Sequence, residues 1–135
     1  MTNIIDNGPA PVVADIDVAT TENTNYRTTM WTGDNLQITL MSIEPGHDIG
    51  LEVHDTHDQF LKIEQGSANV EMGPNEDNLQ TWEASEGYAV VVPAGTWHNL
   101  TCASGVPLKV YSIYAPPQHP HGTVHITKEE AEAAE

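Results

Sequence analysis

Several kinds of residue are scarce in this chain of 135 amino acids, and each scarcity excludes a class of protein. The single cysteine, Cys102, excludes an internal disulfide, and we expect this small thiol to pack in the core. No apolar run approaches the length of a membrane span, and the N-terminal residues lack the charged and hydrophobic regions of a signal peptide. We therefore expect a cytoplasmic protein that does not enter a membrane.

Basic residues are also scarce: four Lys or Arg face twenty Asp or Glu, which gives a net charge of −16. Such a surface repels nucleic acid and anionic membranes, so we expect neither as a partner. A pocket for phosphate usually gathers several cations, often arginine. The scarcity therefore disfavours sugar phosphates as substrates. The four cations are Arg27, Lys62, Lys109 and Lys128.

Turn residues are frequent by contrast, and they separate short segments of alternating hydrophobicity, as in an all-β sandwich or barrel. We expect a single domain over residues 1–135, with a flexible arm at 1–10, a barrel at about 35–115 and a C-terminal loop and helix at 116–135. Thr127 and Glu130 form a capping box that predicts the start of this short helix. The strands are expected at 26–31, 36–43, 50–54, 59–65, 67–72, 79–84, 88–92, 98–102 and 108–115, with a weaker one at 12–16.

Two of these segments carry further expectations. The apolar run of residues 88–92 predicts a strand that is buried on both faces. Residues 50–54 and 59–65 flank a short connection and are expected to pair as a hairpin. Because side chains alternate along a strand, Glu52 and His54 share one face, and Gln59 shares a face with apolar Leu61 and Ile63. The hairpin would therefore direct Glu52, His54 and Gln59 into one cavity.

A second polar position follows the strand at 88–92. The tight Pro-Ala-Gly turn that begins at Pro93 can direct the side chain of His98, at the start of the next strand, toward the inside. Glu52, His54, Gln59 and His98 would be an unfavourable set to bury without a cation or water. This argument favours a metal site.

Both stretches resemble the two sequence motifs of the cupin family, and the resemblance covers roughly residues 35–115. It implies a double-stranded β-helix, that is, a jelly-roll barrel. The first motif is degenerate: Glu52 stands at the family's first histidine, His54 at its second, and Gln59 at its glutamate. The second motif matches at each named spacing. The matching residues are Pro45, Gly46 and Gly66 around the first motif, and Gly87, Pro93, Gly95 and His98 in the second.

The resemblance implies a divalent transition metal. Two imidazoles and one carboxylate, from His54, His98 and Glu52, suit iron(II) and also manganese or zinc. Gln59 would be a weak fourth ligand through its amide oxygen. His57 lies three residues beyond His54 and could swing in as an alternative ligand, or it could be a solvated loop histidine.

Three further histidines lie in the segment 116–125. His119, His121 and His125 could form a second, weak metal site, could fold over the mouth of the barrel, or could belong to an ordinary surface loop.

Three functions remain open at this point. The first is a metal-dependent enzyme acting on a small organic molecule by dioxygenase, decarboxylase or isomerase chemistry, with the metal as a Lewis acid. The second is a non-catalytic module that binds or senses a small ligand through a weakened or empty metal site. The third is a structural barrel with a vestigial site. The resemblance also implies a homodimer, which would hide edge strands.

Overall fold

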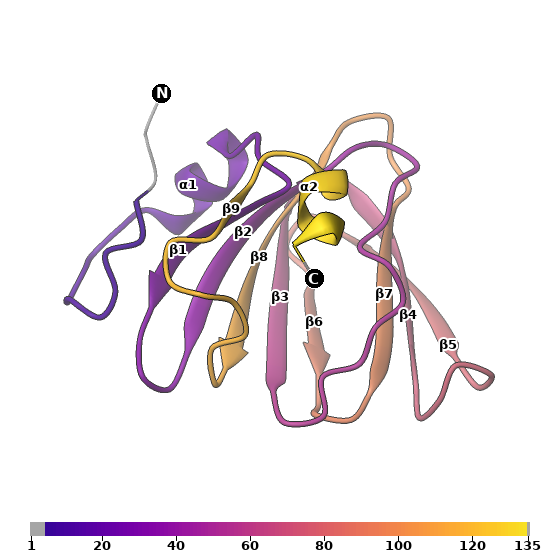
Figure 1. Cartoon of the computed structure of the whole chain (residues 1–135). Coiled ribbons are helices and arrows are strands. Elements are labelled where there is room, and N and C mark those ends of the chain that lie inside the picture. Colours follow the sequence, from indigo (N-terminus) through magenta and orange to yellow (C-terminus); the bar gives the residue numbers. More distant parts are fainter. Residues whose placement is uncertain (1–4, 135) are drawn as a thin grey trace.

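A computed structural model describes residues 5–134, and within them the chain forms a barrel of two antiparallel sheets with two short helices (Figure 1). The larger sheet has the strand order β6-β3-β8-β2-β1-β9, and the smaller has the order β5-β4-β7. This confirms the predicted all-β jelly roll. The elements are α1 (Ile16–Glu22), β1 (Arg27–Thr32), β2 (Gln37–Ile43), β3 (Asp58–Gln65), β4 (Ser67–Gly73), β5 (Gln80–Ser85), β6 (Ala89–Val92), β7 (Trp97–Cys102), β8 (Leu108–Ala115), β9 (Val124–His125) and α2 (Lys128–Ala133).

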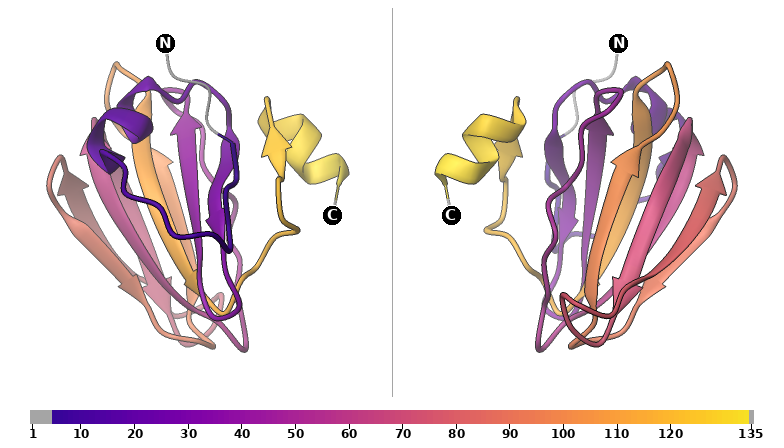
Figure 2. Two further views of the ribbon diagram at one scale, coloured as in Figure 1. Left: turned by 90° about the vertical axis from the view of Figure 1, so that its left-hand side faces the viewer. Right: turned by 90° about the vertical axis from the view of Figure 1, so that its right-hand side faces the viewer.

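The core lies between the inner faces of the two sheets, which diverge from one end of the barrel to the other (Figure 2). Leu61 and Val110 from the larger sheet and Leu100 from the smaller sheet are completely buried there. Fully burying one such side chain stabilises the fold by roughly 1.5–3 kcal/mol. Cys102 is buried in the same cluster, which confirms its expected packing role.

Both faces of β2 are buried, but by different partners. Leu40 and Ile38 pack with Ala19 of α1 on the outside of the larger sheet. Gln37 and Thr39 occupy the inner face and are completely buried. The inner surface of the barrel is therefore polar near one end, and the candidate site lies in this polar region.

The weak strand that was expected at residues 12–16 is absent: residues 12–15 form no regular element, and helix α1 begins at Ile16. Asp15 is its N-cap, and the side-chain Oδ1 accepts a hydrogen bond of 3.1 Å from the backbone N–H of Val18. A side-chain acceptor at this position satisfies one of the free N–H groups of the first turn and so starts a helix. The strand prediction was wrong because it ignored this capping signal.

Among the described residues, the N-terminal and C-terminal segments meet beside β1. Residues 1–4 of the expected arm lie outside the described residues, but the carboxylate of Asp6 accepts four hydrogen bonds, from Gly8, Thr32 (two) and Gly122. Strand β9 pairs with β1, and α2 follows it (Figure 2).

The predicted C-terminal helix is confirmed as α2. Thr127 caps it by accepting a hydrogen bond from the backbone N–H of Glu130. The helix docks through buried Ala131 and through an ion pair of 2.6 Å between Lys128 and Asp48. These contacts supply the docking that a helix of this length needs.

Two further strand predictions need correction. Residues 50–54 form no strand and no hairpin with β3; they run beside β7, which they contact through an isolated bridge between Glu52 and His98. The expected burial of 88–92 on both faces was also wrong. Val90 and Val92 face the core, whereas Val91 is 61% exposed, because no element within residues 5–134 covers the outside of β6 there. Among the described residues, no helix is long and apolar enough to cross a membrane.

Candidate metal centre

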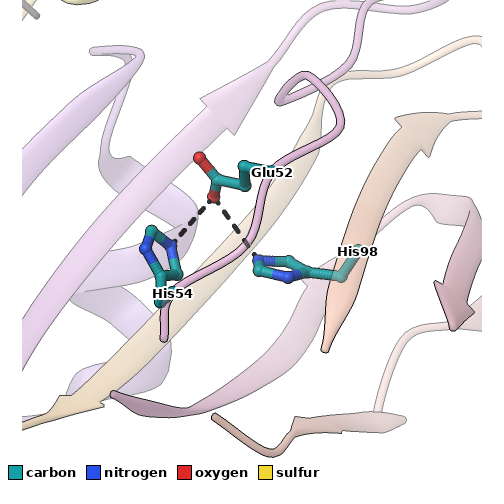
Figure 3. A group of neighbouring side chains, drawn as sticks. All are labelled: Glu52, His54 and His98. Carbon is teal, nitrogen blue, oxygen red and sulfur yellow. Dashed lines mark hydrogen bonds and ion pairs between the residues drawn. The ribbon is translucent and has the colours of Figure 1, made fainter. Parts of the chain in front are cut away.

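Three side chains from two distant parts of the sequence converge inside the barrel (Figure 3). Glu52 Oε1 lies 3.2 Å from His54 Nε2 and 3.4 Å from His98 Nε2. One ligand atom from each of the three residues lies within 4.8 Å of the other two. A single cation could therefore contact all three with small side-chain adjustments, because metal bonds to nitrogen and oxygen measure about 2.0–2.2 Å.

The backbone fixes the relation between Glu52 and His98. Their main chains exchange two hydrogen bonds: Glu52 N–H donates to the His98 carbonyl at 3.0 Å, and His98 N–H donates to the Glu52 carbonyl at 2.9 Å. Residues paired in this way across antiparallel chains point to the same face. The side chains of Glu52 and His98 are therefore brought together by main-chain geometry.

The turn before β7 also holds His54. Gly95 has a φ of +82°, a conformation that glycine adopts without steric cost. Its N–H donates a hydrogen bond of 2.9 Å to the carbonyl of His54. In the same turn, the N–H of Ala94 donates to the carboxylate of Asp58. The Pro-Ala-Gly turn thus locates both His54 and His98, which explains why this short sequence accompanies the ligand set.

His98 is held in a form that can bind a metal. Its Nδ1 lies 3.0 Å from the carbonyl oxygen of Thr96. A carbonyl only accepts hydrogen bonds, so Nδ1 carries the proton and Nε2 presents a lone pair in the neutral ring. Nε2 is buried and has no hydrogen-bond partner, although Oε1 of Glu52 lies only 3.4 Å away. A buried nitrogen of this kind is normally satisfied, and a cation would satisfy it.

Glu52 is the negative charge of the group. Burial alone would raise the pKa of its carboxyl, but the nearby imidazoles of His54 and His98 outweigh burial and lower the pKa to about 2. Glu52 is therefore a carboxylate at neutral pH, which is the form that binds cations.

The other two predicted ligands are placed differently. Gln59 lies on the inner face of β3 and is 3% exposed; its Nε2 donates to Ser112 Oγ at 3.3 Å, while its Oε1 is buried without a partner. His57 is not in the three-residue group. Its Nε2 contacts the carbonyl of Pro117 at 3.1 Å, and its ring centroid lies 6.0 Å from that of His54.

Tyr114, which sequence reasoning missed, stands beside this group. Its ring packs edge-on against His54, at a centroid distance of 5.8 Å, and also against His119, at 5.4 Å. Burial raises the pKa of its hydroxyl, which therefore stays protonated. An inward position on β8, two residues after buried Ser112, was a signal that could have identified it.

The three C-terminal histidines do not gather into a second site among residues 5–134, where the only three-residue group with metal-ligand spacing is Glu52, His54 and His98. His119 folds back onto the barrel against Tyr114. His121 contacts the carbonyl of Gly8, and His125 Nδ1 contacts Arg27.

Residues 39–114 match the cupin domain, and this chain belongs to the cupin family. It is 54% identical over 131 residues to YrkC of Bacillus subtilis, an uncharacterized protein, and the match covers 96% of this chain and 70% of YrkC.

Solved structures agree with this assignment. The crystal structure of BH2720 from Bacillus halodurans is 54% identical, with a TM-score of 0.95 over 96% of this chain and 99% of that one. A Lactobacillus farciminis oxalate decarboxylase is 20% identical, with a TM-score of 0.58 over 64% of this chain and 25% of the enzyme. At that identity the likeness concerns the fold alone.

Proposed function

We propose that this protein binds one divalent transition metal (iron, manganese or zinc) through Glu52, His54 and His98, and uses it to transform a small organic molecule. Gln59 would be a weak fourth ligand. The observation that carries the proposal is the buried Nε2 of His98, which has no hydrogen-bond partner and faces the carboxylate of Glu52 at 3.4 Å. Two imidazoles and one carboxylate with open positions form a ligand set typical of such metals.

When bound, the metal supplies Lewis-acid polarisation of a substrate oxygen. The chain's own residues would hold the substrate. Tyr114 keeps its proton and can donate a hydrogen bond, and the unpartnered Oε1 of Gln59 can accept one. The chemistry that suits this arrangement is dioxygenation, decarboxylation or isomerisation.

Elemental analysis of protein purified without an affinity tag tests the proposal. We expect close to one transition metal per chain. His98→Ala should abolish it, because this substitution removes a ligand with a prearranged lone pair. His47→Ala is the matched control, since His47 is exposed and lies outside the group. If metal survives His98→Ala and disappears only when His119 or His121 is replaced, the site has been misplaced.

A non-catalytic binding or sensor module is the second candidate. The observation that favours it is Gln59, because a neutral amide at this position binds a cation more weakly than a carboxylate does. Screens for oxygen uptake and decarboxylation separate the two functions. Metal-loaded protein that is inactive in both would favour the binding module.

We also propose that the protein is a cytoplasmic homodimer. Trp82, Tyr88 and Val91 line one shallow pocket beside β5 and β6 and are 44%, 55% and 61% exposed. An interface core is enriched in such residues. Analytical ultracentrifugation should give twice the monomer mass, and Trp82→Glu should return the protein to a monomer; a monomeric native chain would contradict this expectation.

A further inference from the structure

The chain contains one arginine, and the fold places it inside. Arg27 lies opposite Met41 across the β1–β2 pair, so both side chains point to the same face of the sheet. Met41 belongs to the core, and Arg27 is only 8% exposed. In a chain with twenty acidic and four basic residues, a buried guanidinium is unexpected.

No acidic side chain among residues 5–134 forms an ion pair with this arginine, whereas Lys62 pairs with Glu64 and Lys128 pairs with Asp48. The Nη1 of Arg27 donates to His125 Nδ1 at 3.1 Å, and its Nε is buried without a partner. Removing one partner of a buried ion pair is strongly destabilising, so a buried charge is normally compensated. The Nε–H group of Arg27 is therefore the donor that a bound anion could satisfy.

His119 presents a second unpartnered group on the same side of the barrel. Gln37 holds residues 118 and 119 by accepting their two N–H groups and donating to the carbonyl of His119. The Nε2 of His119 is buried and has no partner. Burial, and then the charge of Arg27, lower the pKa of this imidazole to about 3, so it is a neutral ring at pH 7. A neutral ring can donate one hydrogen bond without adding charge.

The space beside these groups is large enough for a small molecule. Arg27 and His119 line a cavity of about 340 Å³. Arg27 and Glu52 together border a second cavity, of about 200 Å³. Arg27 therefore borders both the pocket that contains His119 and the pocket that contains Glu52.

We propose that Arg27, assisted by His119, binds the carboxylate of a small organic acid in the pocket that these two residues line, close to Glu52 of the candidate metal group (Glu52, His54 and His98). A guanidinium edge and a carboxylate match in a two-bond fork, and one arginine suffices for one carboxylate, whereas phosphate pockets usually gather more cations. The assignment of this acid as a substrate rests on the proposed function, because the three neighbouring residues must hold a cation for chemistry to follow. Binding of the acid does not depend on that step.

Acetate and acetamide are suitable probes because they have nearly the same shape and differ in charge. Each is titrated into isotopically labelled protein while the resonances of the Arg27 Nε–H group and of the amides at 118 and 119 are followed. We expect acetate to shift these resonances and acetamide at equal concentration to leave them in place. Arg27→Gln should weaken acetate binding at least about tenfold, and Arg27→Lys by less, because lysine keeps the charge but loses the fork.

Lys62→Gln is the matched control. It removes one positive charge from the outside of β3 and keeps a donor for Glu64, so acetate binding should not change. The proposal is overturned if acetate binds Arg27→Gln as tightly as the native chain, or if both probes act alike. If Arg27→Gln does not fold, the proposal is tested by acetate binding to Arg27→Lys and by the comparison of acetate with acetamide on the native chain.

Metal content, measured on the same samples, separates this proposal from the previous one. Native protein that contains metal but ignores acetate overturns the carboxylate site and leaves the metal site standing. Protein that lacks metal but binds acetate through Arg27 overturns the metal site and leaves the carboxylate site standing. His98→Ala should lose metal and keep acetate binding.

Discussion

Gln37 is the residue on which the position of His119 depends, and its replacement by alanine is the most informative perturbation of the fold. The side chain is completely buried. Its Oε1 accepts hydrogen bonds from the N–H groups of Gln118 (3.1 Å) and His119 (2.9 Å). Its Nε2 donates to the carbonyl of His119 (2.8 Å) and to the hydroxyl of Thr32 (3.0 Å). The amide thus joins β2 to a segment some eighty residues away in the sequence.

The expected cost of Gln37→Ala follows from these four contacts. Each hydrogen bond contributes about 1 kcal/mol net, so their loss would cost about 4 kcal/mol if the segment stayed in place. The segment can instead move into water and recover some bonds, which lowers the expected loss of unfolding free energy to about 2–4 kcal/mol. Because small domains are stable by about 5–15 kcal/mol, the variant should still fold.

Urea unfolding and amide hydrogen exchange measure the two consequences. The free energy of unfolding should fall by the stated amount, and the amides of Gln118 and His119 should exchange at least about tenfold faster. Gln80→Ala, at an exposed position on β5, is the control and should change neither. If Gln37→Ala keeps the native free energy of unfolding and the native amide exchange rates at residues 118 and 119, Gln37 does not hold this segment in place.

Two further predictions concern Asp6 and His57. Burial would raise the pKa of Asp6, but its hydrogen bonds outweigh burial and lower the pKa, so its stabilisation is present above the ordinary value of 3.8 and is lost as the pH falls below it. Asp6→Asn should lower the free energy of unfolding by about 1–3 kcal/mol at pH 7. The urea midpoint of the variant should also fall less than that of the native chain between pH 5 and pH 3. An equal fall in both proteins would contradict this prediction. The variant His57→Ala should keep its metal, because the His57 ring contacts the carbonyl of Pro117 and not the candidate metal group. Loss of metal from this variant in elemental analysis would identify His57 as a ligand.

The sequence allowed the barrel and the main side-chain group to be predicted, for reasons that are local. Alternation identified most strands, because a side chain every second residue must face the core. The same parity placed Glu52 and His54 on one face. Their convergence with His98 was predicted correctly, but the pairing was not: the segment carrying Glu52 bonds to β7 and not to β3. Alternation defines which face a residue takes, and it does not define which neighbour pairs with it.

The rest of the interior depended on long-range placement that no local pattern encodes. The scarcity of cations disfavoured phosphate, but it gave no indication that the single arginine would be buried at 8% exposure. His119 belongs to a loop, and its position follows from hydrogen bonds to Gln37, which is 82 residues away in the sequence. Tyr114 lies in a segment whose alternation predicted a strand but gave no sign that this residue contacts the candidate site. The surroundings of Arg27 and the position of His119 both depend on the C-terminal segment, which folds back onto the barrel.

The metal centre is the central claim, and the most direct measurement is anomalous diffraction at the absorption edge of the metal found in the native protein. The account predicts one strong peak about 2.0–2.2 Å from Nε2 of His54, Nε2 of His98 and a carboxylate oxygen of Glu52. A peak beside His119 or His121, or protein loaded with metal that shows none at these three atoms, would contradict it.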